Sequence, residues 1–297
     1  MIEKLVLWGG TSDLNSLRHI WRHYHQTARK LGIESVLCAD ELSSIGHLTP
    51  GSTVIAADQW AQNISARPEV DYVLHNFNGD HPLCVALEPE RLLRLQVWTN
   101  DAVGEEWAPY RRYSREGRIL FQPWGTDLLA EEFMEPIFNA TSSDVTFVGA
   151  IWSDQYQGTE LGNEQVIGEL RSAIAARGLT FRTLTHITDE QNVAAVRSAR
   201  LAPAFAGGWQ VSHNYMPCRV FKNVSYGVAA ITNIPAFHDL FGSWNIKGDN
   251  MVETMNNALS LRSSDYVHLV TEQQRIVAHY TYRESIMALD RAIEAGR

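Results

Sequence analysis

Residues 214–233 read NYMPCRVFKNVSYGVAAITN, and they carry the strongest local signal of secondary structure in the chain. Pro217 precedes a helix of just over two turns, Gly227 ends it, and small and β-branched apolar residues continue as a strand to Thr232. A short helix that passes through a glycine directly into an apolar strand is typical of α/β domains. The stretch therefore predicts one helix–strand step of a parallel sheet.

The preceding residues continue this alternation back to about residue 145. Apolar β-prone runs are separated there by segments with helical periodicity. We expect strands at Val145–Ile151, Thr180–Leu184, Ala199–Phe205 and Val228–Thr232, and helices at Asn163–Arg177, Glu190–Arg197 and Val220–Tyr226.

The first half of the chain carries a second series of the same kind. Lys4–Trp8 is apolar and β-prone, and a helical pattern over Leu14–Leu31 follows it. Further strands are expected at Ser35–Cys38, Thr53–Ala56, Tyr72–Asn76 and Ile119–Gln122, with a helix at Trp60–Ser65 and a helix leading into a strand at Leu92–Thr99. Alternating strands and helices imply a mostly parallel, doubly wound sheet.

The chain is thus expected to hold two doubly wound, Rossmann-like α/β domains. We place them at residues 1–140 and 141–270, with the turn-rich segment Asn139–Ser143 between them. The tail, about Ser264–Ala295, has the apolar spacing of a helix that buries one face. Ligands of open α/β sheets bind at the carboxyl ends of the strands, so we expect function in a cleft that both sheets face.

Composition and charge exclude several classes of protein. A chain of 297 residues, 45% hydrophobic and 20% charged, is long enough for two compact domains. Its formal net charge of −9 disfavours duplex nucleic acid as a partner. Three widely spaced cysteines fit neither a disulfide framework nor a zinc cluster. No apolar stretch approaches the roughly 20 residues that span a bilayer, and the start lacks a signal-peptide pattern, so we expect a soluble cytoplasmic protein.

The motifs of many two-domain α/β enzymes are absent from the sequence. It has no Gly-x-Gly-x-x-Gly after a strand, no phosphate-binding Gly-x4-Gly-Lys-Ser/Thr, no Gly-x-Ser-x-Gly and no His-Glu-x-x-His. The metal-binding pattern Asp-x-Asp is also missing. His19 and His23 lie four apart on a predicted helix, but nothing nearby completes a metal site, and an ordinary amphipathic face is the favoured interpretation. We expect no metal.

Two cations lie in the short helix after Pro217. The first turn of a helix offers unpaired N–H groups and the positive end of the helix dipole, which together stabilise an anion. Arg219 in that turn opposes the dipole unless an anion is bound. With a bound diphosphate, Arg219 and Lys222, three apart on one face, would each donate charge-assisted hydrogen bonds. The alternative is a solvated basic face.

At this point the sequence resembles the GT-B glycosyltransferases, especially the group 1 and spore-maturation-protein-like members. Val145–Gly149, Val-Thr-Phe-Val-Gly, is similar to the strand that opens their nucleotide-binding domain. Arg219–Asn233 matches their helix, glycine and apolar strand, and Asp189–Arg200 is similar to the preceding helix. Gln122–Asp127 resembles their Pro-x-Gly-x-Asp segment. The resemblance implies GT-B architecture in which residues 271–297 form a helix that crosses back to the N-terminal domain.

The resemblance also implies a donor site in the second domain. Its candidate residues are Gly149, Arg219, Lys222, Asn223, Ser225, Tyr226 and Asn233. Many group 1 enzymes carry a Glu, which holds the ribose hydroxyls, at the position of Lys222, and an ammonium cannot accept those hydrogen bonds. Either Lys222 contacts phosphate, which we prefer, or the donor sits differently. The neutral polar residues are equally ordinary as caps or turn residues.

The first domain is expected to supply the base that accepts the proton of the acceptor hydroxyl. Asp13 follows the first strand, and Asp80 and His81 follow the strand at Tyr72–Asn76. Asp13 is an equally good N-cap for the helix that begins at Leu14.

Two further features bear on the sugar and on the acceptor. Trp124 and Trp209, beside glycines in predicted loops, are candidate platforms for a sugar ring. Four arginines between residues 111 and 118 favour a solvated face, the alternative being contact with an anionic acceptor or a membrane surface.

The sequence thus leads to a metal-independent glycosyltransferase of polysaccharide biosynthesis, hexosyl- or deoxyhexosyl-type. It would move a sugar from a nucleoside-diphosphate sugar to a glycan or related acceptor, with no cofactor and no nucleic-acid partner. A nucleotide-sugar epimerase or hydrolase of the same fold is the first alternative, because fold alone does not fix the reaction. A sugar-binding module without catalysis is the second.

Overall fold

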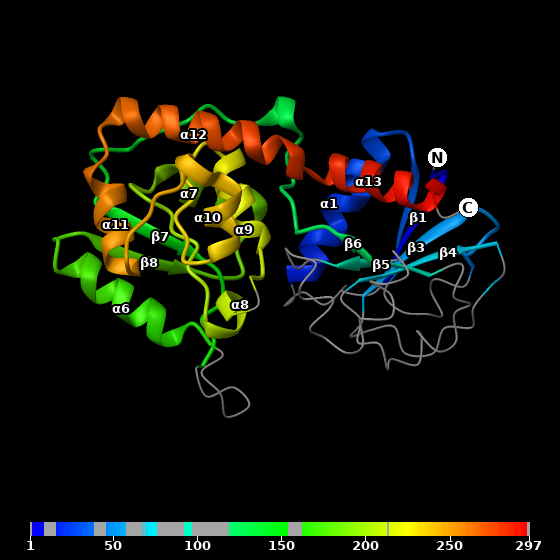
Figure 1. Ribbon diagram of the computed structural model, residues 1–297, viewed down its shortest axis with the longest axis horizontal. Helices are drawn as coiled ribbons and strands as arrows, with labels where there is room; N and C mark the ends of the chain where they lie inside the picture. Colours follow the sequence, from blue (N-terminus) through cyan, green and yellow to red (C-terminus); the bar gives the residue numbers. More distant parts are fainter. Residues whose placement is uncertain are drawn as a thin grey trace. The chain divides into compact units, whose positions relative to one another are not determined.

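The computed structural model of the chain describes residues 2–8, 16–38, 46–57, 67, 69–75, 92–96, 119–153, 162–212 and 214–295. They form two compact units, and Figure 1 shows that each contains both strands and helices. The first unit is Met1–Asp127 together with Tyr282–Arg297, and the second is Leu128–Thr281.

The second unit begins earlier than the expected residue 141. Residues 128–140 belong to it because their backbone is bonded to it: Met134 N–H donates to Ser225 O (2.9 Å), and Ile137 N–H donates to Gly227 O (2.9 Å). Gln274 of the second unit adds a third hydrogen bond, because its Nε2 donates to Met134 O (2.7 Å). The turn-rich segment Asn139–Ser143 therefore lies inside the second unit.

The first unit is built on a six-stranded parallel sheet in the order β2-β1-β3-β4-β5-β6. Its strands are β1 (Lys4–Trp8), β2 (Glu34–Cys38), β3 (Ser52–Ala57), β4 (Asp71–His75), β5 (Leu92–Gln96) and β6 (Ile119–Phe121). Leu5 pairs with both Ser35 and Thr53, so the strand order reverses beside β1. Leu5 to Trp8 are fully buried, as in a sheet covered on both faces. The expected helical start of 92–99 is wrong, because this segment enters the sheet directly as β5.

Helices α1 (Ser16–Lys30) and α13 (Tyr282–Ala295) pack on each other in the first unit (Figure 1). Their apolar stripes meet at Tyr24 and Tyr282, whose rings lie 4.5 Å apart. The amide of Ile2 donates to the Asp290 carboxylate of α13 at 2.5 Å. The expected return of the C-terminal helix to the N-terminal domain is therefore confirmed.

The expected single tail helix is interrupted in the structure. Helix α12 (Ser263–Val277) belongs to the second unit, and a 3-10 turn, η5 (Ala278–Tyr280), ends it. Thr281 is extended, and the amide of Tyr282 donates to Thr126 O (3.3 Å) instead of continuing the helix. The chain therefore changes units at Thr281 and not at residue 271.

Among the described helices, none combines the length and the apolarity that crossing a bilayer requires.

The second unit has one regular parallel pair, β7 (Asp144–Val148) with β8 (Thr180–Leu184). Its helices are α6 (Glu164–Ala175), α7 (Asp189–Ser198), α8 (Gly208–Ser212), α9 (Cys218–Ser225), α10 (Pro235–Phe241) and α11 (Met251–Ser260), together with α12 and the 3-10 turns η2 (Ala130–Glu132) and η4 (Gly242–Trp244). Its core lies between β7, α6 and α12, around Val145, Leu170 and Tyr266.

The segments expected as strands at 199–205 and 228–232 are extended but do not form regular strands. The first segment touches β7 through the bridge Val145–Leu201, and the two segments are joined to each other where Ala204 N–H donates to Ile231 O (2.8 Å). Side chains bond other backbone groups of these segments: Tyr266 Oη accepts from Ala229 N–H (2.9 Å), and Gln273 Oε1 accepts from Ala230 N–H (2.9 Å). Side chains of helix α12 thus make hydrogen bonds that the backbone of a neighbouring strand would make in a regular sheet.

Gln273 provides a test of this arrangement. It is fully buried, and its Nε2 also donates to Trp244 O (2.8 Å). We expect Gln273→Leu to lower the free energy of unfolding by about 2–5 kcal/mol, because it leaves two buried backbone groups unpaired. Urea denaturation followed by circular dichroism measures the change. The exposed Gln165→Leu is the control and should stay within about 0.5 kcal/mol of the parent. Equal stability of the two variants would contradict the role of Gln273.

Candidate functional site

The candidate site lies at the carboxyl end of β7 in the second unit. Side chains alternate along a strand, so Val145, Phe147 and Gly149 share one face. Val145 and Phe147 are fully buried. Gly149 directly follows the strand, and its N–H donates to Leu184 O (2.9 Å) in β8. The hydrogen bonding between β7 and β8 thus fixes the position of Gly149.

Arg219, from the first turn of α9, lies over this face. Its guanidinium carbon is 4.5 Å from the centroid of the Phe147 ring. A Cβ placed on Gly149 would be 2.5 Å from one terminal nitrogen of Arg219. The guanidinium therefore rests on an aromatic ring and against a backbone that has no side chain.

The charge of Arg219 is partly desolvated and has no acidic partner in the described part of the chain. Its side chain keeps some exposed surface, yet the surrounding protein atoms lower the pKa of Arg219 through desolvation, which Cys218 and Tyr215 oppose. None of the described carboxylates lies within ion-pair distance of it. Pro217, the N-cap of α9, supplies no side-chain cap. The site therefore combines a fixed cation with an uncapped helix N-terminus, which favours an anion.

Lys222 lies one turn further along α9, in a different environment. Its side chain is buried at 6% exposure, and its ammonium is 5.9 Å from the centroid of the Tyr226 ring. The alternative interpretation, a solvated basic face, therefore does not describe Lys222. Contact between Lys222 and phosphate stays a prediction.

The neutral candidates of the donor site make contacts within the second unit. Asn223 Nδ2 donates to Ala202 O (2.7 Å), and Ser225 Oγ donates to Lys222 O (2.9 Å). Tyr226 is fully buried in an apolar cluster. Asn233 holds one residue by both backbone groups, because Oδ1 accepts from Ala206 N–H (2.8 Å) and Nδ2 donates to Ala206 O (2.9 Å). These contacts shape the site, and ligand binding by the four side chains stays a prediction.

Two residues at this site were not singled out by the sequence. Phe147 reads only as a strand residue, and its position under Arg219 depends on how α9 packs. Asn163, expected only as the first residue of a helix, is the N-cap of α6, but its side chain makes no capping bond. Instead its Oδ1 accepts from Trp152 N–H (2.8 Å) and its Nδ2 donates to Ala150 O (3.2 Å), which joins the start of α6 to the residues directly after β7.

Gly207 and Gly162 bring a second loop to this point. A Cβ on Gly207 would lie 1.9 Å from Gly162 O, so the backbones before α6 and α8 are in direct contact. Only glycine permits such an approach. The residues directly before α6 are thereby held against Gly207, which follows the extended segment 201–206.

The catalytic candidates Asp13, Asp80 and His81 lie outside the described residues, as does the arginine group at 111–118. In the sequence, Asp13 follows β1, and Asp80 and His81 follow β4. Both strands run in the same direction in the sheet of the first unit, so both end at its carboxyl edge.

The two tryptophans proposed as sugar platforms have different outcomes. Trp124 is 4% exposed and packs edge-on against Trp21 at 6.0 Å. It is part of the interior of the first unit, so its expected role as an exposed platform is wrong. The side chain of Trp209 lies outside the described residues.

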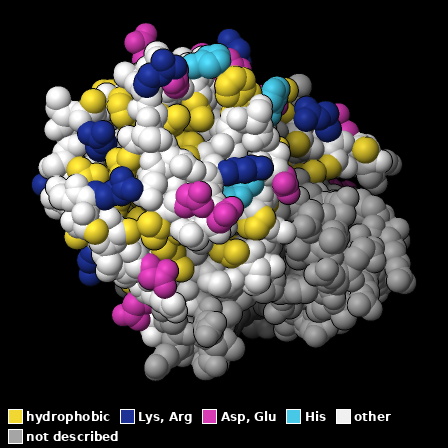
Figure 2. Space-filling model, turned by 60° about the vertical axis from the view of Figure 1, so that its left-hand side comes forward, with side chains coloured by type: hydrophobic (Ala, Val, Ile, Leu, Met, Phe, Trp, Pro, Cys, Tyr) yellow, Lys and Arg dark blue, Asp and Glu magenta, His cyan; other side chains and the backbone are white. Residues whose placement is uncertain are grey.

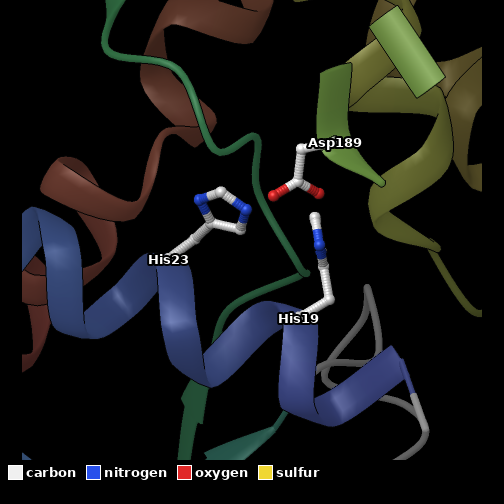
Figure 3. A group of neighbouring side chains, drawn as sticks. All are labelled: His19, His23 and Asp189. Atoms are coloured by element: carbon white, nitrogen blue, oxygen red, sulfur yellow. The ribbon is translucent and has the colours of Figure 1, made fainter. Parts of the chain in front are cut away.

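His19 and His23 project from the same side of α1, with ring centroids 4.3 Å apart (Figure 3). His23 is buried, and its Nε2 lies 3.9 Å from the Asp127 carboxylate. Asp189, also drawn in Figure 3, belongs to the second unit, where it begins α7. His23 is thus a packed residue of the first unit that has an acidic neighbour.

Charged side chains on the face shown in Figure 2 are mixed in sign. Lysines and arginines are interspersed with aspartates and glutamates and do not form one continuous basic area. A duplex nucleic acid is bound chiefly by clustered Lys and Arg that neutralise its phosphates. This face lacks that feature.

Comparison with known proteins shows the fold. No protein-family model matches the chain, and no curated protein matches it significantly. An alpha-glucosyltransferase solved with UDP and a 13-mer DNA containing an HMU base is similar in structure, with a TM-score of 0.59, 10% identity, and coverage of 98% of this chain and 99% of that one.

Two other solved structures show the same likeness. The N-terminal domain of trehalose-6-phosphate phosphatase from Candida albicans has a TM-score of 0.58 at 10% identity and covers 100% of this chain and 97% of its own. A glycosyltransferase from Rickettsia africae has a TM-score of 0.56 at 9% identity, with 99% and 97% covered. The chain therefore has the mixed α/β, Rossmann-like fold of GT-B glycosyltransferases.

Proposed function

We propose that the chain is a metal-independent glycosyltransferase that moves a sugar from a nucleoside-diphosphate sugar to a hydroxyl of a glycan or related acceptor. The second unit would bind the donor, and the first unit would bind the acceptor. The shared fold supports the class of enzyme, and the placement of Arg219 carries the choice of donor.

Arg219 supports a diphosphate ligand for three reasons. Its guanidinium is held in place by Phe147 and Gly149, it lacks an acidic partner among the described residues, and it lies in the first turn of a helix. A planar guanidinium binds two phosphate oxygens at once, and the helix N-terminus adds N–H donors. A pyrophosphate would satisfy both.

The proposed reaction needs charge stabilisation on the donor and a base on the acceptor. The acceptor oxygen forms a bond to the anomeric carbon, and the bond from that carbon to the diphosphate oxygen breaks. The electron pair leaves with the nucleoside diphosphate, and the acceptor proton passes to a base. Arg219 would offset the negative charge that grows on the leaving oxygen, a role that a bound metal has in other enzymes. Asp13, Asp80 or His81 would accept the proton.

The donor site is tested by titration calorimetry with UDP, GDP, ADP, CDP and dTDP. We expect the chain to bind at least one of them. For Arg219→Gln the affinity should fall roughly 10- to 150-fold, because charge-assisted hydrogen bonds worth about 1.5–3 kcal/mol are lost. Arg177→Gln, at an exposed arginine of the same unit, is the matched control and should bind like the parent. Absence of binding by all five nucleotides at millimolar concentration would refute the proposed donor.

The base is tested by separate Asp13→Asn, Asp80→Asn and His81→Asn variants. One of them should lower turnover about 10²- to 10⁴-fold while nucleotide affinity stays within twofold, since a base acts on the acceptor proton and not on donor binding. Release of nucleoside diphosphate in the presence of a panel of saccharides measures turnover, and mass spectrometry identifies the product. Free sugar or an epimerised donor as the only product would favour a hydrolase or epimerase instead.

A further inference from the structure

Most structural arginines of the second unit use their N–H groups within the protein. Arg197 Nη1 donates to Glu135 O (3.1 Å) and to Tyr226 O, and Arg200 Nη1 donates to Ala140 O. Arg219 differs, because in the part of the chain that the structure describes none of its nitrogens has a hydrogen-bonding or ion-pairing partner. Its guanidinium is nevertheless held closely, by a ring on one side and a glycine on the other.

We infer that Gly149 and Phe147 are positioning residues, which hold the guanidinium of Arg219 with its N–H donors free for the diphosphate of the donor. The inference rests on the proposed function, and it gives β7 and the glycine that follows it a role in donor binding. Phe147 and Gly149 act through Arg219 and need not touch the ligand themselves.

Residue 149 must be a glycine because the head group of Arg219 occupies the space that a Cβ would need. A Cβ there would meet three atoms of the Arg219 head group, the terminal nitrogen at 2.5 Å, the guanidinium carbon at 2.7 Å and Nε at 3.2 Å. These atoms belong to the far end of a flexible side chain, so a methyl group at residue 149 would displace the guanidinium and leave the fold intact. The φ of Gly149 is +151°, which adds some backbone strain to any substitution.

Phe147 is required because its ring sets the orientation of the Arg219 guanidinium. Its ring lies two residues before Gly149 on the same strand face, and its centroid is 4.5 Å from the guanidinium carbon. A cation over a ring face is attracted by the quadrupole of the ring, and the attraction is stronger where water is excluded. Phe147 is fully buried, so its ring has no freedom to leave this position. The ring therefore restricts the tilt of the guanidinium, and Gly149 allows its close approach.

A double-mutant cycle tests the coupling. The probe is the nucleoside diphosphate that binds the parent chain most tightly, with inorganic pyrophosphate as a second probe that lacks the base. We expect Gly149→Ala and Phe147→Leu each to weaken binding of both probes at least fivefold. In the Arg219→Ala background, Gly149→Ala should change affinity less than twofold, because the side chain that it displaces is gone. Full additivity, or parental affinity of Gly149→Ala, would overturn the inference.

A matched control separates displacement of Arg219 from backbone strain. Gly178 also has a positive φ, +69°, but nothing lies within 4 Å of an added Cβ. Gly178→Ala therefore imposes strain without a collision, and it should bind both probes like the parent. Weakening by Gly178→Ala equal to that by Gly149→Ala would show that strain alone is responsible.

A second measurement needs no ligand. In a ¹H–¹⁵N spectrum of arginine side chains, the Nε–H signal of Arg219, assigned by its loss in Arg219→Lys, should be shifted upfield by the Phe147 ring. It should move downfield in Gly149→Ala and in Phe147→Leu and stay unchanged in Gly178→Ala. An unmoved signal in Gly149→Ala refutes the positioning role even if no nucleotide binds. Absence of nucleotide binding together with the expected spectral shifts would instead refute the proposed function alone.

Discussion

The second unit depends on side chains that complete its backbone hydrogen bonding where a β-ladder is missing. Asn223, Tyr266 and Gln273 bond the backbone of the two extended segments, and all three come from helices. Buried backbone groups must be paired, so these bonds fix where the helices lie relative to the segments. The positions of α9 and of the loop at Ala206 follow from this constraint, since Asn233 holds that loop by both backbone groups.

The candidate site takes its chemistry from the same packing. Once α9 is fixed, Arg219 reaches the end of β7, where Phe147 and Gly149 leave room for a guanidinium. Desolvation lowers the pKa of Arg219, because the surrounding protein atoms keep water away from its charge. A diphosphate would supply the missing negative charge. A cation that is fixed over a ring and partly removed from water agrees with the proposed donor site.

Local patterns predicted the described strands of the first unit and helices α1, α6, α7 and α9 of the chain, whereas α8, α10 and α11 were not predicted. β1 spans the expected residues, and α9 follows Pro217 and ends before Gly227 as periodicity and capping indicate. The errors come from long-range contacts. Residues 128–140 join the second unit through bonds to Ser225 and Gly227, and the tail helix breaks where Tyr282 bonds Thr126. Trp124 sits beside a glycine like a loop residue, but it is buried against Trp21. These contacts join residues that are far apart in the sequence, so no local pattern predicts them.

Apolar periodicity and glycine stops are local properties, so the residues alone predicted the α/β class and the two-unit plan, and the local charge pattern pointed to Arg219 and Lys222. The return of the last helix was implied by the resemblance to GT-B glycosyltransferases. Tertiary packing, and no local pattern, places Lys222 in a buried position beside Tyr226 and Arg219 over Phe147. The two cations are three residues apart on one helix, yet their surroundings come from strands and loops distant in the chain. Packing, which sums contacts between such distant residues, sets how each charge is solvated.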